Sequence, residues 1–440
     1  MIMENVVFCI VYIMLFFFAM WLQKVNFRTY RTPITFFSVL WTLVGFVANI
    51  GVLEFYYPSL LVNICITFGV IVFTLTYIGM VKPRTIIIFS KFEFDENEVI
   101  NYQLIYILMG IGLVFLIPSS LKSIRLINQY GMVVLRANLT NQDLGVSRGA
   151  LWDNFYTYGV NPIFIATSIL SSVLIFTDQP KRKVIPLFAI SILSLVLMAV
   201  SKASRVEFVR FFFCLLVSLL ICRRQVLRNM LKNKIIRRGL TFAAAIVLII
   251  TFQRANSDRN WWENLLRTVY IYYFSGPSYM TQILKNVTEY GPTGRLLFGT
   301  ATFGFVSNFI SFALTVITGQ SRGSLYLLGS KLTNVPYFVG SNVRVNAMST
   351  CFYNFLLDWS YLGIFLGPFI LAAFASHFTK KLYKLHTIRS MCLYVFFLYI
   401  LFRTCFKLEL VSISFSMTCI YLMLFCRDPK KKVFKSKKEE

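Results

Sequence analysis

The sequence predicts an all-α, polytopic integral membrane protein with about eleven transmembrane helices, organised as a single transmembrane domain over residues 1–440. The chain is 57% hydrophobic and 17% aromatic. Its apolar residues gather in runs of about 17 to 22, the length that crosses a bilayer as a helix. Most charged residues lie between these runs. The expected spans are about 6–22, 34–53, 59–80, 102–118, 161–177, 184–200, 207–222, 239–252, 361–378, 390–404 and 410–425.

Basic residues predict the orientation of these spans. The net charge is +26, and many of the lysines and arginines lie in alternate connections, such as 24–31, 181–183 and 223–238, and in the tail 426–440. By the positive-inside rule this set is cytoplasmic, so the N-terminus is periplasmic or extracellular and the C-terminus is cytoplasmic. The first run ends in Lys24 rather than a small-residue cleavage site and is expected to be an anchor. Topology therefore explains the charge without nucleic acid.

Two outward connections are long on this map, a first outer loop at 119–160 and a second at 253–360. Residues 296–317 are apolar enough to be a further span, but a span here would turn the basic tail outward. We therefore expect re-entrant or interfacial helices within 253–360. Transporters of the alternating-access type usually have short loops and internal repeats. The long loops favour function on the outer face.

Arginine is enriched among the outer basic residues. The expected outer connections hold ten arginines and five lysines, whereas the cytoplasmic ones hold eleven arginines and sixteen lysines. A guanidinium donates two parallel hydrogen bonds to an oxyanion, so the bias indicates a phosphate-bearing ligand. The alternative is that outer arginines neutralise nearby acids or contact lipid headgroups. The candidate ligands in the connections are Arg205, Arg254, Arg322 and Arg344.

The stretch SKASRVEFVR, residues 201–210, places charges between two expected spans. Ser204 and Glu207 fit a capping box, which would make Glu207 a helix cap. Arg210, three residues on, is placed to pair with Glu207 and lies about 7 Å inside the helix. Because a charge there is costly, it is expected to face the protein interior or a wet cavity. Arg205, at the helix N-terminus, is the better anion ligand.

Other candidate groups are few. Tyr273 lies in an aromatic segment that is typical of a membrane interface, and its phenol could instead contact a sugar. The two histidines, His377 and His386, fall at cytoplasmic positions. The outer segments carry no metal-binding or nucleophile motif, and the nine cysteines have no CxxC spacing. An enzyme of this sequence is expected to need no metal, cofactor or histidine base.

Three short segments carry a resemblance to a known family. They are the SR pair at Ser204-Arg205, the YFSGP segment at 273–277, and NAMSTCFYNFLLDWSYLGIFLGP at 346–368. With the many helices and two large outer loops, the chain resembles Wzy-type O-antigen polymerases, the oligosaccharide repeat unit polymerases. The resemblance covers most of the chain in architecture but only these stretches in sequence.

The resemblance implies a bacterial inner-membrane glycosyltransferase that transfers a growing glycan from undecaprenyl diphosphate to an incoming lipid-linked repeat unit, in O-antigen or capsule synthesis. Its expected partners are the undecaprenyl-diphosphate-linked oligosaccharide, membrane lipid, a chain-length regulator and a flippase. Arginines would stabilise the lipid diphosphate as it leaves. An outer carboxylate would act as a weak base, with Asp358 the first choice and Glu207 the second. Alternatively, a helix dipole favours Asp358 at a helix N-terminus.

Three other functions stay open. A lipid-linked oligosaccharide flippase would also need basic residues for diphosphate, although within a cavity between two similar halves. An O-antigen ligase is expected to use a periplasmic histidine, which the chain lacks. A non-enzymatic scaffold or receptor would leave the arginine bias unexplained.

Overall fold

The structure is a computed structural model, and ten of the eleven predicted spans lie among its described residues and are helical. The span predicted at 239–252 lies outside the described residues, apart from Thr241. The ten helices are α1 (Ile2–Phe27), α2 (Pro33–Ile50), α3 (Leu60–Met80), α4 (Tyr102–Asn138), α6 (Asn161–Leu174), α7 (Lys181–Ser201), α8 (Val206–Ile221), α16 (Gly363–Leu385), α17 (Ile388–Arg403) and α18 (Ile413–Phe425). The described residues are 2–52, 55–82, 98–138, 155–177, 179–202, 204, 206–221, 241, 261–287, 289–318, 328, 331–333, 335–345 and 348–427.

Six of the described helical segments are long and apolar enough to cross a membrane. This confirms the coarse prediction of a mainly α-helical, multi-pass membrane protein. The six segments are Met3–Phe27, Pro33–Ile50, Leu60–Met80, Tyr102–Gly131, Lys181–Ser201 and Thr350–Leu385.

The first part of the expected outer loop 119–160 is helical. Helix α4 continues past residue 118 to Asn138, with a break in helical geometry at Gly131, where φ is 80°. Hydropathy marks where a chain leaves the hydrocarbon layer, whereas a helix ends only where its hydrogen bonding ends, so the helix can continue into the predicted outer loop. A short π-helix, η4 (Tyr156–Val160), precedes α6 directly.

The second expected outer loop contains short helices and a hairpin. Its elements are α11 (Trp261–Phe274), α12 (Gly276–Asn286), α13 (Gly304–Thr318), β2 (Tyr337–Gly340), β3 (Val343–Val345) and α15 (Thr350–Trp359). The apolar segment 296–317 is helical only from Gly304, and the 15 residues of α13 span about 22 Å. A helix crossing the hydrocarbon layer needs about 30 Å. The described part of α13 is shorter than such a span, and a re-entrant or interfacial helix stays the prediction for this segment.

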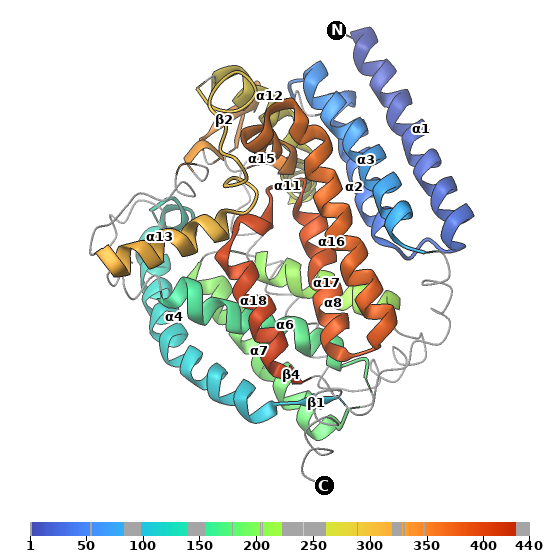
Figure 1. Cartoon of the computed structure of the whole chain (residues 1–440). Coiled ribbons are helices and arrows are strands. Elements are labelled where there is room, and N and C mark those ends of the chain that lie inside the picture. Colours follow the sequence, from blue (N-terminus) through green and yellow to red (C-terminus); the bar gives the residue numbers. More distant parts are fainter. Residues whose placement is uncertain are drawn as a thin grey trace. The chain divides into compact units, whose positions relative to one another are not determined.

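The described chain groups into two compact units, of which the first comprises Met1–Ser90, Trp262–Tyr383 and Ile400–Ile413. Figure 1 shows α1, α2 and α3 of this unit side by side. Aromatic residues form its core: the Phe37 and Phe73 rings stack at 4.2 Å, and Trp41 meets Phe352 edge-on at 4.7 Å. The Trp41 indole N–H donates to Thr404 Oγ1 at 3.0 Å, which satisfies the buried donor.

Polar side chains join the first three helices of this unit. Asn49 of α2 and Asn63 of α3 exchange hydrogen bonds at 2.9 and 3.2 Å, and the Tyr12 hydroxyl of α1 donates to Asn63 Oδ1 at 2.8 Å. All three residues are buried. Within a membrane such bonds hold helices together in a fixed register.

Segments predicted to be outer connections contact one another in this unit. The Tyr56 N–H, between α2 and α3, donates to Val339 O of the hairpin at 2.8 Å. The Thr350 N–H, at the start of α15, donates to Phe406 O, after α17, at 3.1 Å. These contacts place parts of three predicted outer connections together.

The second unit comprises Lys91–Trp261, Lys384–Tyr399 and Ser414–Glu440. All 14 residues of α6 are buried, and α6 packs against α4, α7 and α8. The hydroxyls of α6, such as Ser168 and Ser171, donate to carbonyls three residues earlier, so this helix can be buried without open donors. Apolar residues that include Phe188, Phe208 and Phe211 form the adjacent core.

Segments predicted to be cytoplasmic also contact one another, within this second unit. The Glu98 carboxylate accepts the N–H groups of Ile388 and Arg389 at the start of α17, the second at 2.9 Å. Strand β1 (Val99–Ile100) pairs with β4 (Cys426–Arg427), which follows α18. Three predicted cytoplasmic connections therefore meet. The rest of the predicted tail, 428–440, lies outside the described residues.

Candidate functional site

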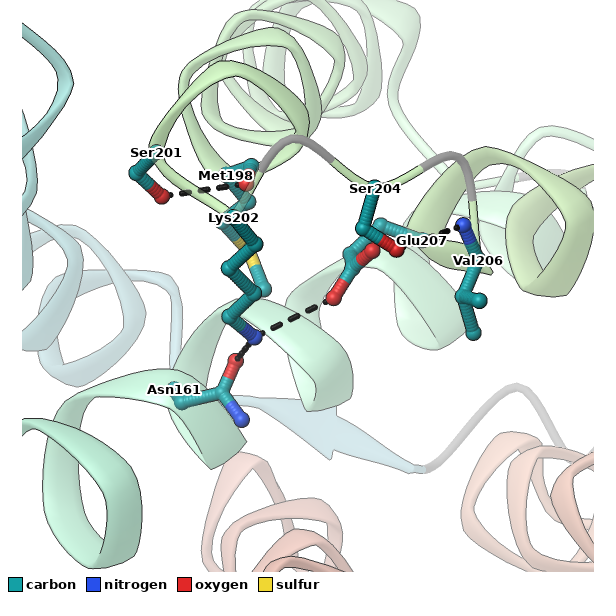
Figure 2. A network of polar contacts seen from close by, with 7 residues as sticks. All are labelled: Asn161, Met198, Ser201, Lys202, Ser204, Val206 and Glu207. Carbon is teal, nitrogen blue, oxygen red and sulfur yellow. Dashed lines mark hydrogen bonds and ion pairs between the residues drawn. The ribbon is translucent and has the colours of Figure 1, made fainter. Parts of the chain in front are cut away.

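A cluster of charged side chains lies where α7 ends and α8 begins, in the second unit. Lys202 directly follows α7, and its N–H donates to Met198 O at 3.1 Å. The Ser204 N–H donates to Ala199 O at 2.9 Å, which holds the turn between the helices. Figure 2 shows the Lys202 side chain directed toward α6 and α8. These two backbone hydrogen bonds thus fix the position of the Lys202 Cα, from which the side chain extends.

The Lys202 ammonium group joins two helices. Its Nζ lies 2.8 Å from Asn161 Oδ1, at the start of α6, and 3.1 Å from Glu207 Oε1, in the first turn of α8 (Figure 2). Glu207 is only 5% exposed. A buried carboxylate requires a cationic or hydrogen-bonding partner, and Lys202 supplies both.

Half of the predicted capping box, the N-cap at Ser204, is present, whereas the return bond from Glu207 is not formed. The Ser204 hydroxyl accepts the Val206 N–H at 3.3 Å, two residues on, and the Ser204 N–H is bonded to Ala199 O. Helix α8 is described from Val206 onward, so Glu207 lies in its first turn. The Glu207 carboxylate pairs with Lys202 rather than with the Ser204 N–H.

Arg210 is the second cation of the cluster. It lies one turn beyond Glu207 on α8, is 7% exposed, and interacts electrostatically with Glu207. Its Nε and Nη2 are buried and have no hydrogen-bond partner in the described structure, and neither has Glu207 Oε2. Nε and Nη2 lie along one edge of the guanidinium, and that edge binds both oxygens of a carboxylate or phosphate side by side.

The donors of the cluster can bind an oxyanion. Lys202 and Arg210 contribute two positive charges and Glu207 one negative charge, so the net charge of these three groups is positive. An ammonium group has three hydrogens, of which Asn161 and Glu207 engage two. The third, together with the open edge of Arg210, provides donors for a phosphate group.

Two members of this cluster, Lys202 and Asn161, were missed in the sequence prediction. Lys202 lay in the quoted stretch but was counted only among the outer lysines. Asn161 follows the π-helix η4, and such helices occur often at functional sites, although no sequence pattern predicts them. The contact between Asn161 and Lys202 spans 41 positions of sequence, so no local motif could indicate it.

Asp358 lies in the other unit and holds a loop. Its Oδ1 accepts the Ala301 N–H at 2.8 Å, and Asn354, one turn earlier on α15, donates to Ala301 O at 2.7 Å. Asp358 is completely buried. It is the penultimate residue of α15, so the alternative of stabilisation at a helix N-terminus is wrong, because the C-terminal end of a helix dipole is negative.

Two of the remaining predicted residues, Tyr273 and Arg344, lie in the first unit. The Tyr273 ring of α11 packs on Phe402 and Phe406 at 5.6 and 5.1 Å. Arg344 is exposed on β3, with its guanidinium 5.9 Å from the centre of the Phe338 ring. Tyr273 and Arg344 belong to the first unit, whereas Arg210 and Glu207 belong to the second. Arg205, Arg254 and Arg322 lie outside the described residues.

Comparison with protein-family models, curated proteins and solved structures finds no match for this chain. Within the described part of the chain, no group of three His, Cys, Asp or Glu residues is arranged to hold a metal ion. The cluster around Arg210 is the part of the described structure whose geometry indicates a function.

Proposed function

We propose that the protein polymerises undecaprenyl-diphosphate-linked oligosaccharide repeat units on the outer face of a bacterial inner membrane. The observation that carries this proposal is the open Nε and Nη2 edge of buried Arg210, one turn from Glu207, which pairs with Lys202. Donors fixed in a water-poor site stabilise charge that develops on a leaving diphosphate. The resemblance to repeat unit polymerases supports the same substrate class.

The reaction transfers a glycan between two lipid-linked molecules. The bond between the sugar C1 and the diphosphate oxygen breaks, and undecaprenyl diphosphate leaves with the electron pair. A hydroxyl of the incoming repeat unit forms the new bond to C1, and its proton passes to a base. In this scheme the open edge of Arg210 binds the leaving diphosphate, and Lys202 pairs with Glu207.

Glu207 is the carboxylate that we assign as the base. Its Oε2 has no hydrogen-bond partner, while Lys202 holds its Oε1, so one oxygen is available next to the proposed diphosphate site. Asp358, the first choice from the sequence, also has an oxygen without a partner, Oδ2, but its Oδ1 accepts the Ala301 N–H and it belongs to the unit that does not contain Arg210. We therefore propose that Asp358 acts by positioning residues 297–303.

Contacts between the loops that connect the helices support an outer location for the cluster of Lys202, Glu207 and Arg210. The predicted outer connections contact one another, and the predicted cytoplasmic connections contact one another through Glu98 and β1. Lys202 and Asn161 both fall at predicted outer ends of helices. The Ser123 hydroxyl of α4, also at a predicted outer end, donates to Ser201 O at 3.1 Å.

Deletion of the gene in its native host tests the function. We expect surface lipid that carries a single repeat unit, with long chains absent, when glycans are analysed by gel and mass spectrometry. Lipid-linked units retained inside the cell would indicate a flippase instead. Long polymer that is not attached to surface lipid would indicate a ligase. Either of these two results would contradict the proposal.

A further inference from the structure

Glu207 and Arg210 do not form the ion pair that their spacing favours. Opposite charges three residues apart on a helix are neighbours and normally pair. Here Glu207 forms its ion pair with Lys202, and Arg210 Nε and Nη2 have no hydrogen-bond partner in the described structure. Both residues are more than nine-tenths buried, so water does not satisfy these nitrogens readily.

The position of Lys202 accounts for this arrangement. Its ammonium group is held from one side by Asn161 of α6, and its backbone by Met198 of α7. Lys202 therefore attracts Glu207 from a fixed point outside α8. Without Lys202, Arg210 would be the cation left to pair with Glu207. The Glu207 carboxylate could then occupy the open guanidinium edge, because a carboxylate fits this edge as well as a phosphate does.

We propose that Lys202 is a positioning residue that holds Glu207 away from Arg210 and so keeps the Arg210 edge free for an oxyanion. This inference rests on the proposed function, because the oxyanion is a phosphate of the lipid diphosphate. It assigns Asn161 a role as well, since Asn161 orients Lys202. The sequence-based prediction assigned no role to Lys202 or Asn161.

The alternative role for Lys202 is direct contact with the phosphate through its third hydrogen. The two roles differ in their dependence on Glu207. If Lys202 only restrains Glu207, removing the Glu207 charge makes Lys202 dispensable for anion binding. If Lys202 is mainly a ligand, removing that charge does not compensate for its loss.

A double-variant experiment tests this inference on the purified full-length chain in lipid nanodiscs, with calorimetric binding of inorganic pyrophosphate as the measurement. We expect Lys202→Met to weaken binding by at least about tenfold, because Glu207 then occupies the Arg210 edge. Combining Lys202→Met with Glu207→Gln should restore binding to near the wild-type value. Glu207→Gln alone should bind at least as tightly as wild type. Lys285→Met, at an exposed lysine in the first unit, is the matched control and should bind like wild type.

The outcomes separate this inference from the proposed function. Wild-type protein that does not bind pyrophosphate would remove the anion site, and the inference with it. If wild-type protein binds pyrophosphate but the double variant binds it as weakly as Lys202→Met does, only the positioning role of Lys202 is overturned. Unchanged binding in Lys202→Met, or weaker binding in Glu207→Gln, would also overturn it. The Glu207→Gln result stands even if Lys202→Met does not fold.

Discussion

Lys202 Nζ lies 3.1 Å from Glu207 Oε1, and this ion pair crosses from the end of α7 to the first turn of α8. It leaves Arg210, one turn further along α8, with an open pair of donors in a buried position. The proposed chemistry depends on this arrangement, in which the Glu207 carboxylate is paired with Lys202 and the Nε and Nη2 edge of Arg210 is available to a phosphate.

Arg210→Lys tests whether the shape of the cation matters. Lysine keeps the charge but cannot donate two parallel hydrogen bonds from a planar edge. We expect polymer formation to slow by at least about tenfold in cells that produce the variant at wild-type level. Arg31→Lys, at an exposed residue between α1 and α2, is the matched control and should leave polymer length unchanged. A wild-type polymer ladder from Arg210→Lys would exclude bidentate binding at this residue.

Asp358→Asn separates positioning from catalysis. Asparagine keeps an oxygen that can accept the Ala301 N–H, so the variant should fold and retain polymerase activity. Asp358→Leu leaves that N–H without its acceptor and should cost about 1 to 3 kcal/mol of stability. The measurements are the midpoint of thermal unfolding and the polymer length. An Asn variant that is stable but inactive would instead support the catalytic role predicted from the sequence.

Gly367→Ala tests the packing of α15 on α16. A Cβ at Gly367 would overlap the ring of Phe355, whereas a Cβ at Gly79 of α3 would meet no atom within 4 Å. We expect the Gly367 variant to lose about 1 to 3 kcal/mol of stability. Gly79→Ala should be neutral or slightly stabilising, because alanine has the higher helix propensity. Equal unfolding midpoints for the two variants would show that this close packing is absent.

Asn342→Cys tests the side of the membrane on which the hairpin lies. Asn342 is exposed between β2 and β3, so a thiol here should react with a membrane-impermeant maleimide in intact spheroplasts. Lys384→Cys, near the end of α16, should react only after permeabilisation. Mass spectrometry of the labelled protein gives the result. The opposite labelling pattern would invert the map and place the Lys202 cluster on the cytoplasmic side.

The fold was more accessible from sequence than the site. Apolar run lengths were enough to locate helices such as α2 and α7, because crossing a bilayer fixes both length and hydropathy. The extension of α4 to Asn138 and the separate helix α15 were missed, since neither changes hydropathy in a distinctive way.

The site was only partly accessible for a different reason. Arg210 and Glu207 were identified because charge is rare beside an apolar run. Lys202 was not identified as the partner of Glu207, because the three-residue spacing on the helix favoured a pair between Glu207 and Arg210. The position of Lys202 depends on its contact with Asn161, and so on how α6 packs against α7 and α8. Asp358 was selected as a carboxylate next to an expected span. Its backbone partner, Ala301, is 57 positions away and could not be inferred locally.

The most direct test of the central claim is polymerisation by the purified chain. The protein in nanodiscs would be mixed with the lipid-linked repeat units that the deletion strain accumulates, and the products would be separated by mass. We predict glycans longer than one repeat unit, with one undecaprenyl diphosphate released for each new bond, and little product from Arg210→Lys. Intact single repeat units after incubation with folded, pyrophosphate-binding protein would contradict the proposal.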